Sequence, residues 1–279
     1  TGTFEFDGVY HVSMGYTGTP DDALYSTDYM TKPVRSVSRL HVGTEYMGLA
    51  PEDFRNTNAN FDVTFDVTDG YVTITPKAVT VRAIDASKTY GDTDPAFTAT
   101  VEGLLEGETV AYSLSREAGE DVGAYAITPV GEAVQGDYAV TFVPGTLTVN
   151  AGTMTLTATG YEGKYDGAAH GGTVECSVST ARILYSTDGE TWTETAPRVT
   201  HVADGPLTVF VKAEDSNHET ATASYTLQVL PRSVTLTSAS GSKVYDGTPL
   251  TNSTVTVGGD GFVSSEGATY HVTGSITDA

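Results

Sequence analysis

The sequence predicts an all-β chain, arranged as a tandem array of small two-sheet sandwiches. Strand-forming Thr, Val and Tyr dominate the 279 residues together with 30 turn-forming Gly. Short apolar runs alternate with polar residues in YVTITP (71–76), AVTVRAI (78–84) and GTLTVN (145–150), which is the period-two signature of half-buried strands. A third observation, a motif that recurs along the chain, indicates that the strands are organised in repeats.

The recurring motif places an aromatic residue beside Asp and Gly. Its four copies are TFEFDGVYH (3–11), DASKTYGDTDP (85–95), EGKYDGAAH (162–170) and GSKVYDGTPL (241–250). The aromatic residues Phe6, Tyr90, Tyr165 and Tyr245 are 84, 75 and 80 residues apart. The last three each follow the start of an alternating run by 11 residues, counted from Val79, Met154 and Val234. A fixed offset from a strand indicates a repeated structural unit. We call this sequence the aromatic-Asp-Gly motif.

Alternating runs that end at Pro76, Asn150 and Pro231 are each followed at once by another run. We therefore predict four modules, 1–76, 77–150, 151–231 and 232–279, and expect neighbours to share little buried surface. The first module lacks the initial strand that precedes the motif in its siblings, and the last has only 48 residues. We expect both to be incomplete members of a longer array.

Two module folds are open at this point. An immunoglobulin-like (Ig-like) sandwich is favoured because the strands are many, short and alternating. The alternative is a compact β-grasp-like unit, in which LLEGE (104–108) forms an abbreviated helix.

Several segments resemble known bacterial repeats. TYGDTDPAFTATVEGLLEGE (89–108), VGAYAITP (122–129) and GDYAVTFVPGTLTV (136–149) resemble the MBG-type repeat of bacterial surface adhesins. KVYDGTPLTNSTVTVGGDGF (243–262) and KYDGAAHGGTV (164–174) resemble the related YDG-type repeat. The first module is similar to a truncated repeat of either type, and the third is a divergent YDG-type module. YSTDGETW (185–192) also resembles a turn of Ig-like modules attached to bacterial glycosidases. The resemblance implies a long, surface-exposed protein without shared catalytic residues.

Charge and cysteine content limit the partners. The chain has 14 Lys plus Arg against 36 Asp plus Glu, a net charge of −22. Nucleic acid is excluded as a partner because phosphate binding needs a basic surface. No apolar run reaches the ~20 residues of a membrane span, so we expect no membrane insertion. One cysteine, Cys176, excludes an internal disulfide and a multi-cysteine metal site.

We interpret the motif as a structural turn. Asp accepts a backbone N–H two residues on, and Gly supplies a positive φ. The turn residues are Asp7, Gly8, Tyr90, Gly91, Asp92, Tyr165, Asp166, Gly167, Tyr245, Asp246 and Gly247. The second interpretation is calcium binding through the Asp92–Asp94 pair, although calcium takes six to eight oxygens and the sequence has no complete calcium loop. We expect no other cofactor.

No catalytic residues are predicted. The six His are scattered without zinc-binding spacing, and no Gly-x-Ser-x-Gly elbow or phosphate loop is present. For binding, Tyr161 and Trp192 flank turns and are the candidates for stacking on a sugar ring. A covalent Lys–Asn cross-link between Lys77 and Asn150 is a further hypothesis, opposed by their positions at opposite ends of the module if its first and last strands run parallel.

These observations lead us to expect a non-enzymatic stalk of a bacterial cell-surface adhesin, which spaces a distal binding head from the cell wall. The chain would be extracellular and anchored through other parts of its parent, with neighbouring repeats as its partners. The alternatives are a module that binds a host or bacterial surface glycan, glycoprotein or mucin, and an accessory domain of a surface glycosidase.

Overall fold

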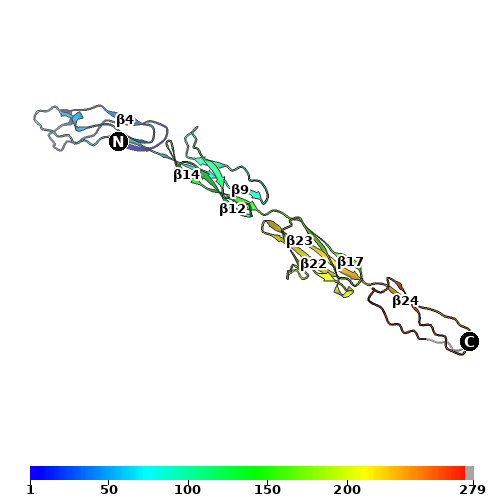
Figure 1. Cartoon of the computed structure of the whole chain (residues 1–279). Coiled ribbons are helices and arrows are strands. Elements are labelled where there is room, and N and C mark those ends of the chain that lie inside the picture. The colour runs from blue at the N-terminus through cyan, green and yellow to red at the C-terminus, as the bar shows by residue number, and fades with distance from the viewer. Residues whose placement is uncertain (274–279) are drawn as a thin grey trace. The chain divides into compact units, whose positions relative to one another are not determined.

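The computed structural model describes residues 1–273 and separates into two compact units, Thr1–Asn150 and Ala151–Ala279 (Figure 1). Strands hold 45% of the described residues and helices 3%, so the prediction of an all-β protein is confirmed. The division into units falls at the predicted 150/151 boundary, whereas the scheme of four modules stays a prediction. The last six residues of the predicted module 232–279 lie outside the described residues.

The N-terminal unit contains fifteen strands and two short 3-10 helices. Its strands are β1 Gly2–Glu5, β2 His11–Met14, β3 Met30–Thr31, β4 Ser36–Arg39, β5 Gly43–Tyr46, β6 Arg55–Asn56, β7 Tyr71–Thr75, β8 Lys77–Ala83, β9 Ala86–Thr89, β10 Ala99–Glu102, β11 Ser113–Arg116, β12 Gly123–Val130, β13 Val134–Gln135, β14 Tyr138–Val143 and β15 Gly145–Asn150. The helices are η1 Thr27–Tyr29 and η2 Pro51–Asp53.

The C-terminal unit contains ten strands and one 3-10 helix among its described residues. The strands are β16 Leu156–Thr159, β17 Tyr161–Lys164, β18 His170–Gly171, β19 Thr173–Cys176, β20 Arg182–Ser186, β21 Arg198–Val199, β22 Leu207–Asp215, β23 His218–Leu230, β24 Val234–Ser238 and β25 Val255–Gly259, and the helix is η3 Val202–Asp204.

Residues 77–150 form a sandwich of two four-stranded sheets, with strand orders β10-β8-β14-β13 and β11-β12-β15-β9. The alternating sequence explains the arrangement, because one face of each strand supplies the core. Ile127 and Leu147 are fully buried, and each such side chain contributes about 1.5–3 kcal/mol relative to an exposed one. The predicted sandwich is therefore present in this module.

The first and last strands of this sandwich each cross from one sheet to the other. β8 continues into β9 through Ile84 and Asp85, and β14 continues into β15 through Pro144. The two crossings are joined, since the backbone N–H of Thr146 donates to Asp85 Oδ1 at 2.7 Å. A Cβ on Gly145 would lie 2.7 Å from the carbonyl oxygen of Ala83, so the crossing requires glycine.

Residues 1–76 contain the three-stranded sheet β1-β7-β5 and the pairs β2-β4 and β3-β6. Their core is continuous with the next module: Phe6 and Ile74 belong to the same buried cluster as Val81 and Tyr138. The rings of Phe6 and Tyr138 meet edge to face at 5.7 Å. The expectation that neighbours share little buried surface is therefore wrong at the 76/77 junction, because apolar side chains from both sides close one core.

In the C-terminal unit, the four-stranded sheet β17-β23-β22-β20 packs with the pair β16-β19, and β18-β21 and β24-β25 form two further pairs. β22 and β23 are the long central strands, visible in Figure 1, with a register irregularity between Ala213 and Asp215. Val209, Val211 and Leu227 are fully buried between the strands.

The β-grasp alternative is wrong. Residues 104–108 form no helix, and every helix in the described part of the chain is a 3-10 turn of three residues. The sequence explains the difference, because Gly103 and Gly107 have φ of 100° and 82° and interrupt a helical conformation. None of the described helices has the length or apolar character needed to span a membrane.

Candidate functional site

The recurrent structural feature is a short parallel ladder between the first and last strands of a module. β1 pairs with β7, β9 with β15, and β17 with β23, each over four residues. Because the paired strands run in the same direction, the chain enters such a module at one end of the ladder and leaves at the other. We call this feature the terminal ladder.

The aromatic residue of the motif extends each terminal ladder by one hydrogen bond. The backbone N–H of Phe6 donates to the carbonyl of Thr75 at 2.9 Å, that of Tyr90 to Asn150 at 2.8 Å, and that of Tyr165 to Leu230 at 2.9 Å. The acceptor is the last residue of the final strand in every case. The motif therefore marks the end of the ladder, which explains its fixed distance from the preceding strand.

The Asp and Gly of the motif form a corner beyond the ladder. Asp7, Asp166 and Asp246 accept the backbone N–H two residues on, at 3.1, 2.9 and 3.0 Å. The second copy has another arrangement, in which the N–H of Asp92 donates to the carbonyl of Thr89 at 3.0 Å. The glycines of all four copies have positive φ, between 77° and 87°: Gly8, Gly91, Gly167 and Gly247. L-residues adopt this region only with strain.

Two corners carry the same His and aromatic partners. His11 Nε2 lies 3.1 Å from Asp7 and its ring stacks on Phe4, with ring centroids 4.0 Å apart. In the third module, His170 Nε2 lies 2.9 Å from Asp166 and its ring stacks on Tyr161 at 3.9 Å. The side-chain hydrogen bond with His170 lowers the pKa of Asp166. Each His thus joins the corner to the ladder strand.

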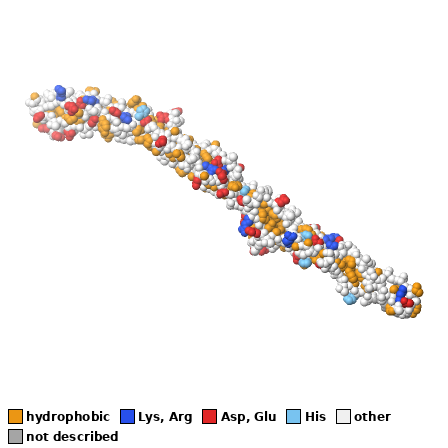
Figure 2. Space-filling model, viewed as in Figure 1, with side chains coloured by type: hydrophobic (Ala, Val, Ile, Leu, Met, Phe, Trp, Pro, Cys, Tyr) orange, Lys and Arg blue, Asp and Glu red, His pale blue; other side chains and the backbone are white. Residues whose placement is uncertain are grey.

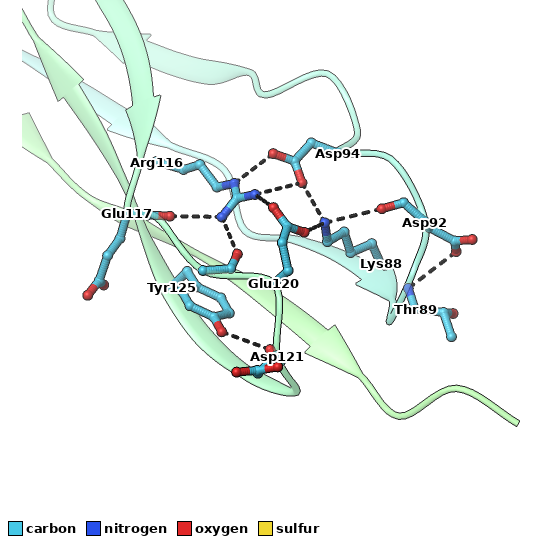
Figure 3. Close-up of polar contacts among 10 residues, drawn as sticks. Lys88, Thr89, Asp92, Asp94, Arg116, Glu117, Glu120, Asp121 and Tyr125 are labelled. Atoms are coloured by element: carbon cyan, nitrogen blue, oxygen red, sulfur yellow. Dashed lines mark hydrogen bonds and ion pairs between the residues drawn. The ribbon is translucent and has the colours of Figure 1, made fainter. Parts of the chain in front are cut away.

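The second module replaces the His with an ion cluster of Lys88, Asp94, Arg116 and Glu120 (Figure 3). Lys88 lies in β9 with its side chain 3% exposed, and its Nζ contacts Asp94 Oδ1 at 2.8 Å and Glu120. Nζ also donates to the carbonyl of Asp92 at 3.2 Å. The cluster therefore holds the corner against the end of the ladder.

Arg116 connects the same corner to the β11–β12 hairpin. Its Nε donates to Asp94 at 2.6 Å, and its NH2 group donates to Glu120. The hydrogen bond from Lys88 is the main cause that lowers the pKa of Asp94 and of Glu120, with Arg116 next in both. The same carboxylates raise the pKa of Lys88. All four groups are therefore charged at neutral pH.

The proposed calcium ligands do not form a ligand set here. Both carboxylate oxygens of Asp94 accept from Lys88 or Arg116, and Asp92 directs one oxygen to the N–H of Thr89 at 3.4 Å. Within residues 1–273, no group of three or more His, Cys, Asp or Glu has an arrangement suited to a metal ion. The residues present do not fit calcium, because two cations already occupy the position beside Asp94.

The two candidate sugar-stacking residues are not brought together by any contact among the described residues. One face of Tyr161 is covered by His170. Trp192 has Lys212 Nζ 4.7 Å from its ring centroid, and it lines a shallow groove of about 480 Å³ with Phe210 and Gly189. The structure thus places Trp192 in a groove and Tyr161 in the ladder strand β17, against the histidine of the corner.

The hypothetical cross-link partners Lys77 and Asn150 lie at opposite ends of the sandwich. Lys77 pairs with Tyr138 at the start of β14, whereas Asn150 pairs with Thr89 at the end of β9. Lys77 Nζ contacts Glu5 at 3.1 Å. A covalent bond between Lys77 and Asn150 is therefore geometrically excluded.

Contacts within each unit also fix the junctions between predicted modules. The sequence did not predict these contacts. Asp137 accepts from the backbone N–H of Val42 at 2.7 Å and contacts His41 Nδ1 at 2.8 Å. In the C-terminal unit, Lys164 Nζ donates to Asp260 at 2.7 Å, and Arg232 donates to the carbonyl of Tyr165 at 3.1 Å. Single charged residues carry no periodic signal, which is why pattern analysis misses them.

The fourth copy of the motif stands apart from the other three. Tyr245 is 65% exposed, and no strand among the described residues contains it. Its corner is closed locally, since Lys243 Nζ donates to Asp246 at 2.7 Å. Hydrogen bonds from Lys243 and Thr248 lower the pKa of Asp246 to about 2. The corner therefore forms without a terminal ladder.

Comparison with known proteins supports the predicted repeat type. Residues 79–148 match the family model of the MBG domain (YGX type), so the predicted resemblance of this segment to MBG-type repeats is confirmed. No curated protein matches the chain.

Solved structures with tandem modules are similar at low identity. The N-terminal Ig1-2 module of the Drosophila receptor protein tyrosine phosphatase DLAR is 13% identical, covers 56% of this chain and 99% of its own, and has a TM-score of 0.23. The EC1-4 region of Drosophila N-cadherin is 11% identical, with coverages of 82% and 74% and a TM-score of 0.23. Since such TM-scores do not establish a shared fold, the assignment of a sandwich rests on the strand pairing.

Proposed function

We propose that this chain is a non-enzymatic stalk segment of a bacterial cell-surface adhesin, which withstands tension and spaces a distal binding head from the cell wall. The terminal ladder is the observation that carries the proposal. It recurs in three modules with the same polarity and ends at the same motif residue. The MBG match over residues 79–148 supports a repeat of a surface protein.

The polarity of the ladder suits it to tension. When a chain is pulled from both ends, two parallel terminal strands are drawn in opposite directions along their length. The hydrogen bonds between them are then loaded together and resist as a group. In an antiparallel hairpin pulled from its open end, the bonds break one at a time. A module closed by a parallel ladder therefore yields at a higher force.

The surface and sites of the chain agree with a spacing role. The charged corner residues pair with one another, as Lys88 does with Asp94 and Glu120. Acidic side chains are visible on the face of the N-terminal unit in Figure 2, and such charge opposes aggregation of exposed strand edges. We place the segment outside the cell, with neighbouring repeats as its constant partners.

The test is single-molecule pulling of the whole chain from its two ends, with two adjacent proline substitutions. Tyr90 donates its backbone N–H to the carbonyl of Asn150 in β15. Successive backbone N–H groups of a strand point to opposite sides of it, within the plane of the sheet. The N–H of Ala86, four residues before Tyr90, therefore faces β15, and that of Ser87 faces away. Ala86→Pro removes a ladder bond and is expected to lower the unfolding force of the N-terminal unit.

Ser87→Pro is the matched control. It places proline one residue later in the same edge strand, β9. Proline is tolerated there because the N–H that it removes points away from the sheet. We expect the control to keep the unfolding force of the original chain. Equal forces for the original chain and Ala86→Pro would show that the terminal ladder does not bear the load, and the stalk proposal would lose its support.

A further inference from the structure

The four-stranded sheet of the C-terminal unit has one face in the core and one face outside it. Val209 and Val211 belong to the buried core cluster, so Phe210, which lies between them in β22, projects from the opposite face. Phe210 is 40% exposed and lines the groove of about 480 Å³. Sites for small molecules commonly measure about 300–1,000 Å³. The groove therefore has the size of a ligand site on the outer face of the sheet.

Strand register places Trp192 on the same face. Phe210 pairs with Ser186 in β20. Tyr185, the residue before Ser186, forms an antiparallel bridge with Thr193, which sets Trp192 beside Ser186 on the outer face. Ser186 is small and buried, and it separates the two aromatic residues. Trp192 and Phe210 together therefore form an aromatic border of the groove.

The turn before Trp192 is fixed by its own hydrogen bonds. Asp188 Oδ1 accepts the backbone N–H of Thr191 at 2.7 Å and that of Glu190 at 2.8 Å. The hydroxyl of Ser186 also donates to it, at 2.8 Å. The hydrogen bonds from the backbone of Thr191 and Glu190 are the main causes that lower the pKa of Asp188. Trp192 is thus held in position before a ligand arrives, which reduces the ordering cost of binding.

The other border of the groove carries hydroxyl groups. Ser224 in β23 pairs with Phe210 on the side away from β20. Thr222 and Ser224 line the groove, and both are exposed. Within residues 1–273, no hydrogen-bond partner occupies their hydroxyl groups or the indole N–H of Trp192. Three polar groups beside an aromatic surface are therefore free to bond a ligand.

The charges around the groove favour a neutral ligand. No charged side chain lines it among the described residues. Lys212 Nζ lies 4.7 Å from the ring centroid of Trp192 and is paired with Glu214 at 2.7 Å. The net charge of −22 repels an anion, whereas a cation would find no carboxylate in the groove and would meet Lys212. Neither sign of charge is therefore recognised.

We propose that this groove binds a neutral pyranose sugar of a glycan. The apolar C–H face of the sugar ring stacks on Trp192, and the sugar hydroxyls bond to Thr222 and Ser224. Sugar hydroxyls both donate and accept hydrogen bonds, as Ser and Thr hydroxyls do, and an indole ring combines an apolar face with a polar N–H. The proposal goes beyond the spacing role and does not depend on it.

The first test uses the fluorescence of Trp192, which is the one tryptophan of the chain and so reports on the groove directly. The whole chain is titrated with three neutral disaccharides: cellobiose, lactose and N,N′-diacetylchitobiose. We expect at least one of them to change the fluorescence to saturation, with a Kd below about 10 mM, as suits a shallow site. An unchanged signal with all three would overturn the proposal.

The second test locates the sugar by its hydrogen bonds. Thr222→Val replaces a hydroxyl group by a methyl group of similar size, and it should weaken binding of the same disaccharide about fivefold, as expected for the loss of one hydrogen bond. Thr226→Val is the matched control and should keep the original Kd, because Thr226 is exposed on the same face of β23 but does not line the groove.

Both variants keep Trp192 and hence the fluorescence signal. If Thr222→Val binds the disaccharide as well as the original chain does, or if both variants lose the same affinity, the hydroxyl border does not hold the sugar and the proposal fails.

Discussion

At the corner of the aromatic-Asp-Gly motif, a single residue determines whether the backbone can turn without strain. Gly91 has a φ of +87°, and a Cβ built on it meets no atom within 4 Å. Any effect of a side chain at this position must therefore come from the backbone conformation rather than from a clash.

We predict that Gly91→Ala lowers the free energy of unfolding of the N-terminal unit by about 1–2 kcal/mol, the cost of placing an L-residue in the left-handed region. Chemical denaturation measures this loss in the free energy of unfolding. Gly123→Ala is the control, since Gly123 lies in β12, has no left-handed φ, and its Cβ would meet only Asp121 O at 3.9 Å. An equal loss in both variants would mean that the corner imposes no special conformation.

The ion cluster gives a second prediction for single residues, namely acid sensitivity. Lys88 and Arg116 hold the pKa values of Asp94 and Glu120 below their ordinary 3.8 and 4.5. A carboxyl group with a lowered native pKa stabilises the fold above its unfolded pKa, and this contribution is lost as the pH falls through the native value. The melting temperature of the N-terminal unit should therefore fall from about pH 4.5 downwards.

In Lys88→Met the same acid titration should produce a smaller fall in melting temperature, because the carboxylates lose their main partner. Arg82→Met serves for comparison, since Arg82 is exposed in β8 and has no ion pair among the described contacts. It should keep the original pH dependence. Identical pH profiles for the original chain and Lys88→Met would show that the cluster does not set the acid response.

At the scale of elements, periodicity predicted the strands that lie on a core and failed where a strand needs a partner. YVTITP, AVTVRAI and GTLTVN became β7, β8 and β15 almost residue for residue. Residues 61–67 have an equally clear alternation but form no ladder. Side-chain alternation reports which face is buried, whereas pairing depends on a neighbouring strand that local sequence does not contain.

The candidate site was only partly accessible from sequence for a related reason. The spacing of the motif revealed a repeated corner, because Asp and Gly have local conformational roles. The function of Phe6, Tyr90 and Tyr165 as the last donors of a parallel ladder depends on residues about 60–70 positions away. The pairing of Lys88 with Glu120 is similarly non-local, and one sequence has no signal that connects the two.

Strand crossing between sheets supplies the prediction at this scale. Gly160 separates β16 from β17, where the first strand of the third module changes sheets, and a Cβ there would lie 2.0 Å from the carbonyl oxygen of Thr226 in β23. Gly160→Ala must push two backbones apart, so we expect a loss of about 1–3 kcal/mol in the stability of the C-terminal unit.

The control for this prediction is Gly171→Ala in β18. Its Cβ would have Pro197 O as nearest atom at 3.4 Å, an ordinary contact distance, and its φ is not left-handed. Denaturation of both variants should show a loss only for Gly160→Ala. A stable Gly160→Ala variant would indicate that β16 and β17 do not cross next to β23 as described.

At the scale of the whole molecule, the dominant property is charge. The chain has 14 basic and 36 acidic residues. Acidic groups are found in both units, from Asp7 and Asp94 to Asp166 and Asp260. Like charges spread over the whole chain make two copies repel each other at neutral pH. This repulsion protects a protein with open strand edges.

We predict that the osmotic second virial coefficient, measured by static light scattering at 25 °C, is strongly positive at pH 7 and low salt. It should fall towards zero or below as the pH approaches the isoelectric point of about 4.3, because protonation removes the net charge. At 1 M salt the Debye length shrinks from about 30 Å at 0.01 M to about 3 Å. The coefficient should then be low already at pH 7 and change little with pH. If the coefficient falls by the same amount at high and low salt, charge repulsion is not the cause, because salt screens charges but leaves apolar association in place. Contacts between strand edges would then control self-association.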